Sequence, residues 1–262
     1  MFFPMDLKLK DKVALVLAAS KGLGKASAFA LSAEGAKVVI SSRNAEELKK
    51  TAAEIHKQTG NPVVSIPADV SDAAQVIELI KKTAETFGGI DILVNNSGGP
   101  PFAHFETFDD DAWQKAFDLT LLAFARTGRE VLPYMKKAGS GRIINIVSSS
   151  AKSVLNNAVL STAMRMGVVG MAKLMADELG PYQITVNNIA PGLILTDRVK
   201  EVLPKDVDVE QALKDRAKTI PVGRIGKPEE LGALVAFLAS EQAAYISGTT
   251  ISIDGGASRA IF

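Results

Sequence analysis

The sequence of 262 residues contains no cysteine and only two histidines. Without cysteine the chain can form neither a disulfide nor a thiolate metal site, and thiol catalysis is excluded. The histidines, His56 and His104, fall in different segments of the chain. We therefore expect no metal centre, because a histidine-based site needs its ligands close together.

An excess of charge of one sign is also missing. The formal net charge is +1, which gives no electrostatic reason to expect nucleic acid or an acidic membrane surface as a partner. No run of about 18 apolar residues predicts a membrane span, and the N-terminus lacks the basic region of a signal peptide. Hydrophobic residues make up 47% of the chain, which is typical of a globular core. We expect a cytoplasmic protein with no membrane partner.

Short apolar runs alternate with longer segments of helical periodicity. The predicted strands are Val13–Ala18, Lys37–Ile40, Val63–Ile66, Ile90–Val94, Gly141–Val147, Ile184–Ile189 and Thr249–Ile253. The predicted helices are Gly24–Glu34, Ala45–Gln58, Asp72–Thr86, Asp110–Lys137, Ala158–Leu179, Lys205–Lys218 and Pro228–Ser240. This alternation predicts a doubly wound parallel sheet of about seven strands with helices on both faces. Because no linker or repeat interrupts it, we expect residues 1–262 to form one α/β domain.

A glycine-rich turn joins the first predicted strand to the first helix. It reads Ala18-Ala19-Ser20-Lys21-Gly22-Leu23-Gly24. Such a turn lets the backbone approach a pyrophosphate, and the helix N-terminus that follows offers unpaired N–H groups to the anion. Ala18 stands where a first glycine is common. The alternative is an ordinary glycine turn, but its place at the first strand–helix junction favours a dinucleotide site.

The end of the second strand predicts which dinucleotide binds. A carboxylate there accepts a hydrogen bond from the ribose 2′-OH of NAD, whereas an arginine nearby accommodates the 2′-phosphate of NADP. Here Ser42 occupies the expected acidic position, Arg43 follows it, and Lys21 lies in the glycine turn. Two cations beside hydroxyl groups suit a phosphate dianion. We expect NADP(H) rather than NAD(H), unless both cations are only solvated surface residues.

These motifs resemble the short-chain dehydrogenase/reductase family across essentially the whole chain. Lys21-Gly22-Leu23-Gly24 is similar to the phosphate loop of that family. Asp69-Val70 resembles the segment whose acid touches the adenine, and Asn95-Asn96-Ser97-Gly98 resembles the family's Asn-Asn-Ala-Gly segment. Pro191-Gly192, with Ile194 and Thr196, resembles the loop that flanks the nicotinamide.

Two further segments are similar to the closing motifs of the family, Gly223–Glu230 and Ser247–Gly256. Several of these motifs resemble the 3-oxoacyl-carrier-protein reductase branch. The resemblance implies a single-domain Rossmann fold, NADP(H)-dependent hydride transfer on a small-molecule substrate, and a homo-oligomer, either a dimer or a tetramer.

The catalytic positions depart from the family pattern of Asn, Ser, Tyr and Lys. The serine position falls on Ser148, but the asparagine falls on Thr120, the tyrosine on Ser161 and the lysine on Arg165. A serine hydroxyl is a much weaker acid than a phenol, and an arginine stays charged at ordinary pH. Arg165 can still hold ribose hydroxyls or attract an oxyanion. We therefore expect these four residues to form an atypical catalytic set.

Other side chains offer alternatives for proton delivery. Lys152 lies four residues after Ser148, and His104 follows the fourth strand, where ligands approach an open parallel sheet. A solvated loop lysine is the simpler interpretation of Lys152. Asn156 and Asn157 either orient a polar substrate or cap the next helix.

Two functions are compatible with this pattern. The first is an NADP(H)-dependent oxidoreductase that acts on a small carbonyl or alcohol with modified proton delivery. The second is a nucleotide-binding protein without redox turnover, a sensor or a partner subunit, which the changes at Thr120, Ser161 and Arg165 favour.

Overall fold

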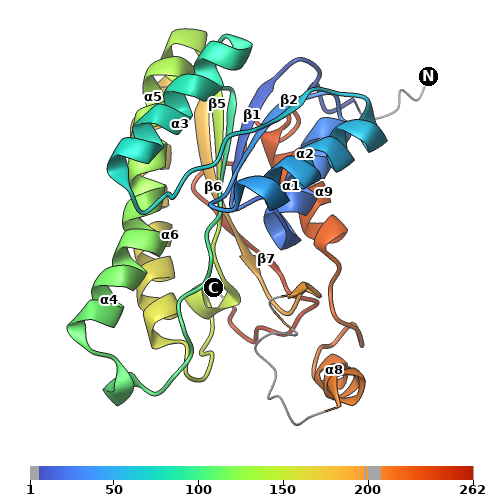
Figure 1. Ribbon diagram of the computed structural model, residues 1–262. Coiled ribbons are helices and arrows are strands. Elements are labelled where there is room, and N and C mark those ends of the chain that lie inside the picture. The colour runs from blue at the N-terminus through green and yellow to red at the C-terminus, as the bar shows by residue number, and fades with distance from the viewer. Residues whose placement is uncertain (1–5, 198, 200–207, 262) are drawn as a thin grey trace.

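The computed structural model describes residues 6–197, 199 and 208–261. At its centre lies one seven-stranded parallel sheet in the order β3-β2-β1-β4-β5-β6-β7 (Figure 1). The strands are β1 (Val13–Leu17), β2 (Lys37–Ser41), β3 (Val63–Ser65), β4 (Ile92–Asn95), β5 (Gly141–Ile146), β6 (Ile184–Pro191) and β7 (Thr250–Ile253). All seven predicted strands are confirmed, with only their ends shifted by one or two residues.

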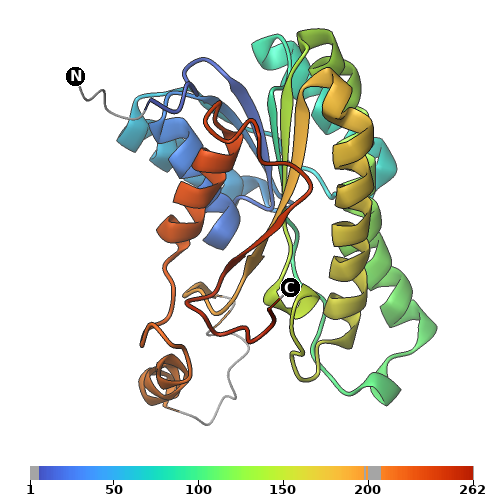
Figure 2. The ribbon, with the colours of Figure 1, turned by 180° about the vertical axis from the view of Figure 1, so that it is seen from behind.

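The two faces of the sheet carry separate hydrophobic cores, because side chains alternate along a strand. In β1, Ala14 and Val16 belong to one core, while Leu15 and Leu17 belong to the other. The first core packs beneath α1 (Gly22–Ala33), α2 (Ala45–Thr59) and α9 (Pro228–Ala239). The second packs beneath α3 (Ala73–Phe87), α5 (Ala123–Ala138) and α6 (Val159–Leu179), on the opposite face (Figures 1 and 2). The predicted single-domain Rossmann fold is confirmed.

The long helix predicted over Asp110–Lys137 is not regular throughout. It consists of α4 (Asp110–Phe117), a π-helical segment (Asp118–Leu122) and α5. A π-helical turn adds a residue without ending the helix, so the apolar pattern continues and the sequence gives little sign of it. Thr120, predicted to lie in a regular helix, instead lies in this wider turn.

Four helix starts differ from the prediction. Helix α1 begins at Gly22 instead of Gly24, and α3 begins at Ala73, one residue after Asp72. The helix expected over Lys205–Lys218 is α8 (Val209–Lys218), and residues 205–207 lie outside the described residues. The carboxylate of Asp208 accepts hydrogen bonds from the first-turn backbone of α8, as an N-cap does. Ala158 precedes α6 instead of beginning it.

The sequence alone did not predict a possible membrane span, yet one helix meets the criteria of length and composition. The segment Val159–Tyr182, which is α6 with the turn after it, contains an 18-residue window with a mean hydropathy of 1.2. A helix that packs on the sheet of a globular protein can satisfy the same criteria, and Ala172 of α6 belongs to the core over β5 and β6. The expectation of no membrane partner therefore stays a prediction.

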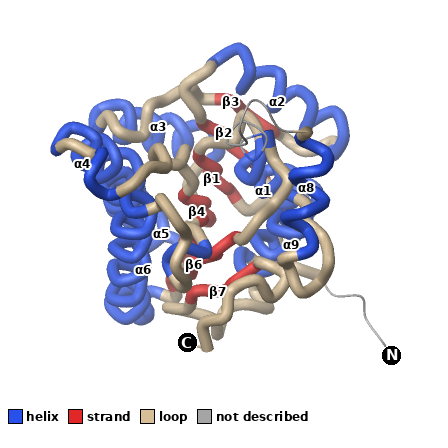
Figure 3. The backbone as a smooth tube through the Cα atoms, turned by 90° about the horizontal axis from the view of Figure 1, so that it is seen from below, coloured by secondary structure: helices blue, strands red, loops and turns tan. Residues whose placement is uncertain are grey.

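The sheet order determines where a ligand can enter. The chain moves outward from β1 to β2 and β3, and then returns to place β4 on the other side of β1. Figure 3 views the molecule from the side where the strands end, with β1 and β4 adjacent near its centre. In sheets of this kind, ligands bind outside the carboxyl ends of the strands at the point where the order reverses.

Candidate functional site

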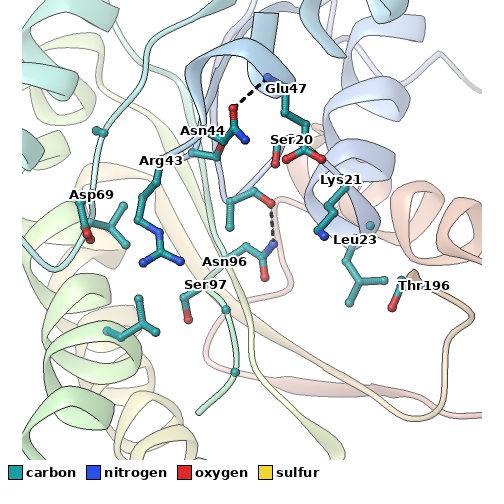
Figure 4. A pocket seen from close by; sticks show the side chains of 18 of the residues that line it. Ser20, Lys21, Leu23, Arg43, Asn44, Glu47, Asp69, Asn96, Ser97 and Thr196 are labelled. Atoms are coloured by element: carbon teal, nitrogen blue, oxygen red, sulfur yellow. Dashed lines mark hydrogen bonds between the residues drawn. The ribbon is translucent and has the colours of Figure 1, made fainter. Parts of the chain in front are cut away.

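A cleft of 570 Å³ lies at this reversal point (Figure 4). The glycine turn, the end of β2, the loops after β3 and β4, and one segment after β6 form its walls. Twelve of the predicted nucleotide-binding residues line it: Ala18, Ser20, Lys21, Gly22, Leu23, Ser42, Arg43, Asp69, Val70, Ser97, Gly98 and Thr196. The fold thus brings together motifs that are far apart in the sequence.

The glycine turn between β1 and α1 depends on two glycines for different reasons. Gly22 has a φ of +57°, a left-handed conformation that glycine adopts without steric cost. Gly24 allows α1 to lie against β1, because a Cβ at this position would be 2.4 Å from the carbonyl oxygen of Ala18. Ala18 itself has a φ of +47°, although it carries a Cβ. The turn therefore leaves a cradle of the kind that accepts a pyrophosphate at a helix N-terminus.

The end of β2 presents groups that suit a phosphate. The Ser42 hydroxyl is buried and has no hydrogen-bond partner among the residues that the structure describes. Figure 4 shows Arg43 extending from this strand end toward the middle of the cleft, with Lys21 on the other side of Asn96. A buried hydroxyl without a partner costs stability until a ligand satisfies it. The hydroxyl and the two cations thus suit the 2′-phosphate of NADP. Position 42, where an NAD site would carry a carboxylate, is a serine.

The remaining predicted nucleotide-binding residues do not line the cleft. They are Gly24, Asn95, Arg165, Pro191, Gly192 and Ile194. Asn95 is buried, and its amide nitrogen donates to the Asn145 oxygen at 2.9 Å. Asn145 donates in turn to Asn188, also at 2.9 Å. This amide ladder joins β4, β5 and β6 at the register of Asn95, the last residue of β4.

The segment after β6 is held against β7 and the loop before α9. The Gly192 amide donates to the carbonyl of Ile253 at 3.0 Å, and a Cβ on Gly192 would lie 2.6 Å from the Cβ of Asp254. Further along, Ile194 is buried and pairs with Gly226 in a single parallel bridge. These contacts position the chain that leads into the cleft at Thr196.

The catalytic positions come from elements that pack together. Ser148 follows β5 and accepts a hydrogen bond from the Ser150 amide at 3.1 Å, which caps the 3₁₀ turn Ser149–Ala151. That turn contacts α6, whose first turn carries Ser161. The Thr120 hydroxyl is buried and donates back to the Ala116 carbonyl of the preceding turn. Thr120 is thus engaged within its own helix, and none of these three residues has a titratable group near neutral pH.

Arg165 is the one charged group of this set, and it is buried. Its side chain is 4% exposed, and burial lowers the pKa of its guanidinium to about 10. One terminal nitrogen donates to the Ile146 carbonyl at 2.8 Å and the other to the Ser97 hydroxyl at 3.3 Å. The Phe124 ring lies 5.3 Å from the guanidinium carbon. Arg165 therefore connects α6 to the ends of β4 and β5 and reaches the cleft only through Ser97.

The alternative proton donors do not line the nucleotide cleft. The ammonium of Lys152 donates to the carbonyl of Thr250 at 3.2 Å, which directs the side chain toward β7. His104 lines a separate groove of 470 Å³ together with Asn156 and Asn157. The suggestion that these asparagines cap the next helix is wrong, because α6 has no side-chain cap and Ala158 stands at its N-cap.

Several cleft residues were not predicted from the sequence. They are Asn44, Glu47, Ala68, Asn96, Gly99, Leu119 and Asp197. Asn44 could have been found, because an asparagine before an acidic first turn is a helix N-cap signal, and its oxygen accepts from the Glu47 amide at 3.1 Å. Asn96, which donates to the Ala18 carbonyl at 3.4 Å, lies within a motif already recognised. Leu119 belongs to the π-helical segment and carries no sequence signal.

Comparison with known proteins finds reductases that match nearly the whole chain. The family described as enoyl-(acyl carrier protein) reductase matches residues 17–258. The short-chain reductase protein NovJ of Streptomyces niveus is 35% identical over 248 residues, covering 94% of each chain. The 3-oxoacyl-[acyl-carrier-protein] reductase FabG of Thermotoga maritima is 35% identical over 255 residues, covering 95% of this chain and 99% of the relative.

A solved structure extends the similarity to the whole fold. The L-sorbose reductase of Gluconobacter frateurii, complexed with NADPH and L-sorbose, superposes with a TM-score of 0.94 at 31% identity. The alignment covers 98% of this chain and 100% of that one. With the sheet order, the glycine cradle and the matched motifs, these similarities show that the chain belongs to the short-chain dehydrogenase/reductase family of oxidoreductases and resembles its 3-oxoacyl-carrier-protein reductase branch.

Proposed function

We propose that this protein is an NADP(H)-preferring reductase that transfers hydride between the nicotinamide and a small carbonyl or alcohol substrate, with an atypical proton-delivery system. The observation that carries the cofactor preference is the end of β2, where Ser42 and Arg43 line the cleft and neither position carries an acid. A charged donor beside a phosphate forms a stronger hydrogen bond than a neutral one.

The chain's own residues would then divide the work along the cleft. The glycine turn with Lys21 would hold the pyrophosphate, Asp69 the adenine, and Arg43 the 2′-phosphate. The bound nicotinamide supplies or accepts the hydride. Ser148 and Ser161 would orient the substrate oxygen by hydrogen bonds. The buried guanidinium of Arg165 would stabilise negative charge that develops on this oxygen, because charges interact strongly in a medium of low dielectric constant. Proton transfer to that oxygen would come from water, because these two hydroxyls are weak acids.

The preference can be tested by titrating the purified protein with NADPH and, separately, with NADH while following nucleotide fluorescence. Saturable binding that is tighter for NADPH supports the proposal. The Arg43→Met variant should weaken NADPH binding by roughly tenfold and leave NADH binding unchanged, because only NADPH carries the 2′-phosphate. Arg129→Met is a matched control, since this exposed arginine pairs with Glu130 on α5 instead of lining the cleft. Equal affinity for both nucleotides in the wild type contradicts the preference.

A second function, nucleotide binding without redox turnover, is favoured by one observation. Thr120 is hydrogen-bonded inside its own helix and Arg165 is buried, so neither directly offers a side chain to the cleft. The double variant Ser161→Tyr with Arg165→Lys restores the family's acid and its cation. NADPH oxidation by the wild type with any member of a carbonyl panel supports the reductase. Turnover in the double variant alone supports the second function.

We also propose that the protein is a cytoplasmic homo-oligomer that associates through α5 and α6. The outer surface of α6 supports this proposal, because Met166 is 56% exposed and Leu174 is 66% exposed. Large apolar side chains grouped on one helix are typical of a surface that another protein covers. Light scattering of the purified protein would give the mass of the assembly, and the mass of one chain would contradict the proposal.

A further inference from the structure

Arg165 is a buried cation that no acid neutralises within residues 6–197, 199 and 208–261. The ion pairs of this part of the chain do not include it, and its Nε is buried without a hydrogen-bond partner. Its other two nitrogens donate to the Ile146 carbonyl and the Ser97 hydroxyl. A buried charge without a counterion is costly, so one that persists often has a role in binding or catalysis.

The bond between Arg165 and Ser97 has only one possible direction. A guanidinium has donors and no acceptor, so the Ser97 oxygen must accept. The single proton of the Ser97 hydroxyl then points elsewhere, and it donates to no protein atom among the residues that the structure describes. Ser97 lines the cleft, as Figure 4 shows, while Arg165 does not. The arginine therefore leaves the serine with a proton available to a ligand in the cleft.

Both residues also depart from the family pattern. Ser97 stands at the alanine of Asn-Asn-Ala-Gly, and Arg165 stands at the lysine position. They lie 68 residues apart in the sequence and are in contact in the fold. The hydroxyl of Ser97 and the guanidinium of Arg165, which replaces the ammonium of a lysine, thus form one hydrogen-bonded unit.

The sheet order shows which half of a dinucleotide Ser97 would meet. Arg43 follows β2 and the glycine turn follows β1, whereas Ser97 follows β4 on the far side of β1. A dinucleotide lies across this reversal point with its pyrophosphate on the glycine turn. If the phosphorylated adenosine ribose lies at Arg43, the nicotinamide and its ribose lie on the side of Ser97.

We propose that Arg165 and Ser97 form a relay in which the Ser97 hydroxyl donates a hydrogen bond to a hydroxyl oxygen of the nicotinamide ribose. Arg165 acts in it as a positioning residue, because it fixes the acceptor side of Ser97 and polarises its O–H group. This inference rests on the proposed binding of NADP(H). It assigns a function to the buried guanidinium that needs no direct contact between Arg165 and the ligand.

The test compares NADPH with adenosine 2′,5′-bisphosphate, which lacks the nicotinamide ribose. Ser97→Ala should weaken NADPH binding by about fivefold, the effect of one hydrogen bond, and leave the bisphosphate unchanged. Ser97→Thr retains the hydroxyl and should restore the NADPH affinity. Arg43→Met is the opposite control, because it should weaken both ligands. NADH should follow NADPH in the Ser97 variants, since both contain the nicotinamide ribose.

The contribution of Arg165 is measured by a double-mutant cycle. Arg165→Met should weaken NADPH by a similar factor, and combining it with Ser97→Ala should cost no more than either change alone. A urea unfolding curve confirms that each variant is folded. If wild-type protein binds both ligands but Ser97→Ala affects neither, or weakens both equally, the relay is refuted while nucleotide binding stands. If wild-type protein binds neither ligand, the proposed function fails as well.

Discussion

Replacing Gly24 with alanine should both destabilise the protein and loosen its nucleotide cleft. A Cβ at this position would lie 2.4 Å from the Ala18 carbonyl oxygen, 2.8 Å from the Ala19 Cα and 2.9 Å from the Ala18 carbonyl carbon. All three atoms belong to the backbone of the glycine turn, so no flexible side chain can move aside. Either α1 moves away from the turn or the turn itself changes shape.

Two opposing effects determine how much Gly24→Ala changes the free energy of unfolding. Forcing an extra carbon into a packed site costs about 1–3 kcal/mol, whereas alanine in a helix is better than glycine by up to about 1 kcal/mol. Gly24 lies in the first turn of α1, where the gain in helix propensity is smallest, so the steric cost prevails. We expect a net loss of about 1.5 kcal/mol in the free energy of unfolding, which corresponds to a melting temperature lower by roughly 3–6 °C.

Urea unfolding followed by circular dichroism would measure the free energy of unfolding, and the NADPH titration would measure the affinity of the cleft for the nucleotide. Gly89→Ala is the matched control, because a Cβ there meets no heavy atom within 4 Å and its φ is not positive. This control should be neutral or slightly more stable. A Gly24→Ala protein with the stability and NADPH affinity of the wild type would refute the close packing of α1 on the turn.

Two further predictions concern local conformation and charge. Ala18 has a φ of +47°, so Ala18→Gly should remove left-handed strain. The expected gain in stability is up to about 1 kcal/mol, reduced by the greater conformational entropy of glycine in the unfolded chain. A urea midpoint below that of the wild type would contradict this. A hydrogen bond from Arg224 lowers the pKa of Glu230 to about 2, so the carboxylate should stabilise the fold above its ordinary pKa near 4.3 and lose that effect as the pH falls toward 2. Urea unfolding of Glu230→Gln should therefore show a deficit against wild type at pH 7 that disappears near pH 2, and a deficit that is constant with pH would contradict this origin.

Local sequence patterns predicted most of the fold because each pattern has one physical cause. The strands were found from apolar runs such as Val13–Ala18, since a strand buried on both faces carries apolar side chains on both sides. The start of α3 was predicted to within one residue of its N-cap, Asp72. The start of α8 was predicted four residues too early, although Asp208 caps it. The π-helical turn at Thr120 was missed, because the amphipathic pattern continues across it.

The candidate site was predicted where a motif lies within one strand–turn–helix unit, as the glycine turn does. It was not predicted where residues meet only through the fold. Glu47 lines the cleft one helical turn before Thr51, whose hydroxyl bonds the Ser20 carbonyl at 2.7 Å. No spacing in the sequence indicates that contact, because most of α1 and all of β2 lie between the glycine turn and α2.

The sequence by itself determined the alternating sheet, the glycine cradle and the basic end of β2, because local spacing encodes all of these. The resemblance to the family implied the altered catalytic positions. Only the tertiary structure showed that Ser97 and Arg165, two of the departures from the family pattern, lie in contact. Only it showed that Arg165 is buried and that Asn95 belongs to the amide ladder instead of the cleft wall. The physical reason is that burial and hydrogen-bond partners depend on which strands are neighbours, and the order of the sheet is not the order of the chain.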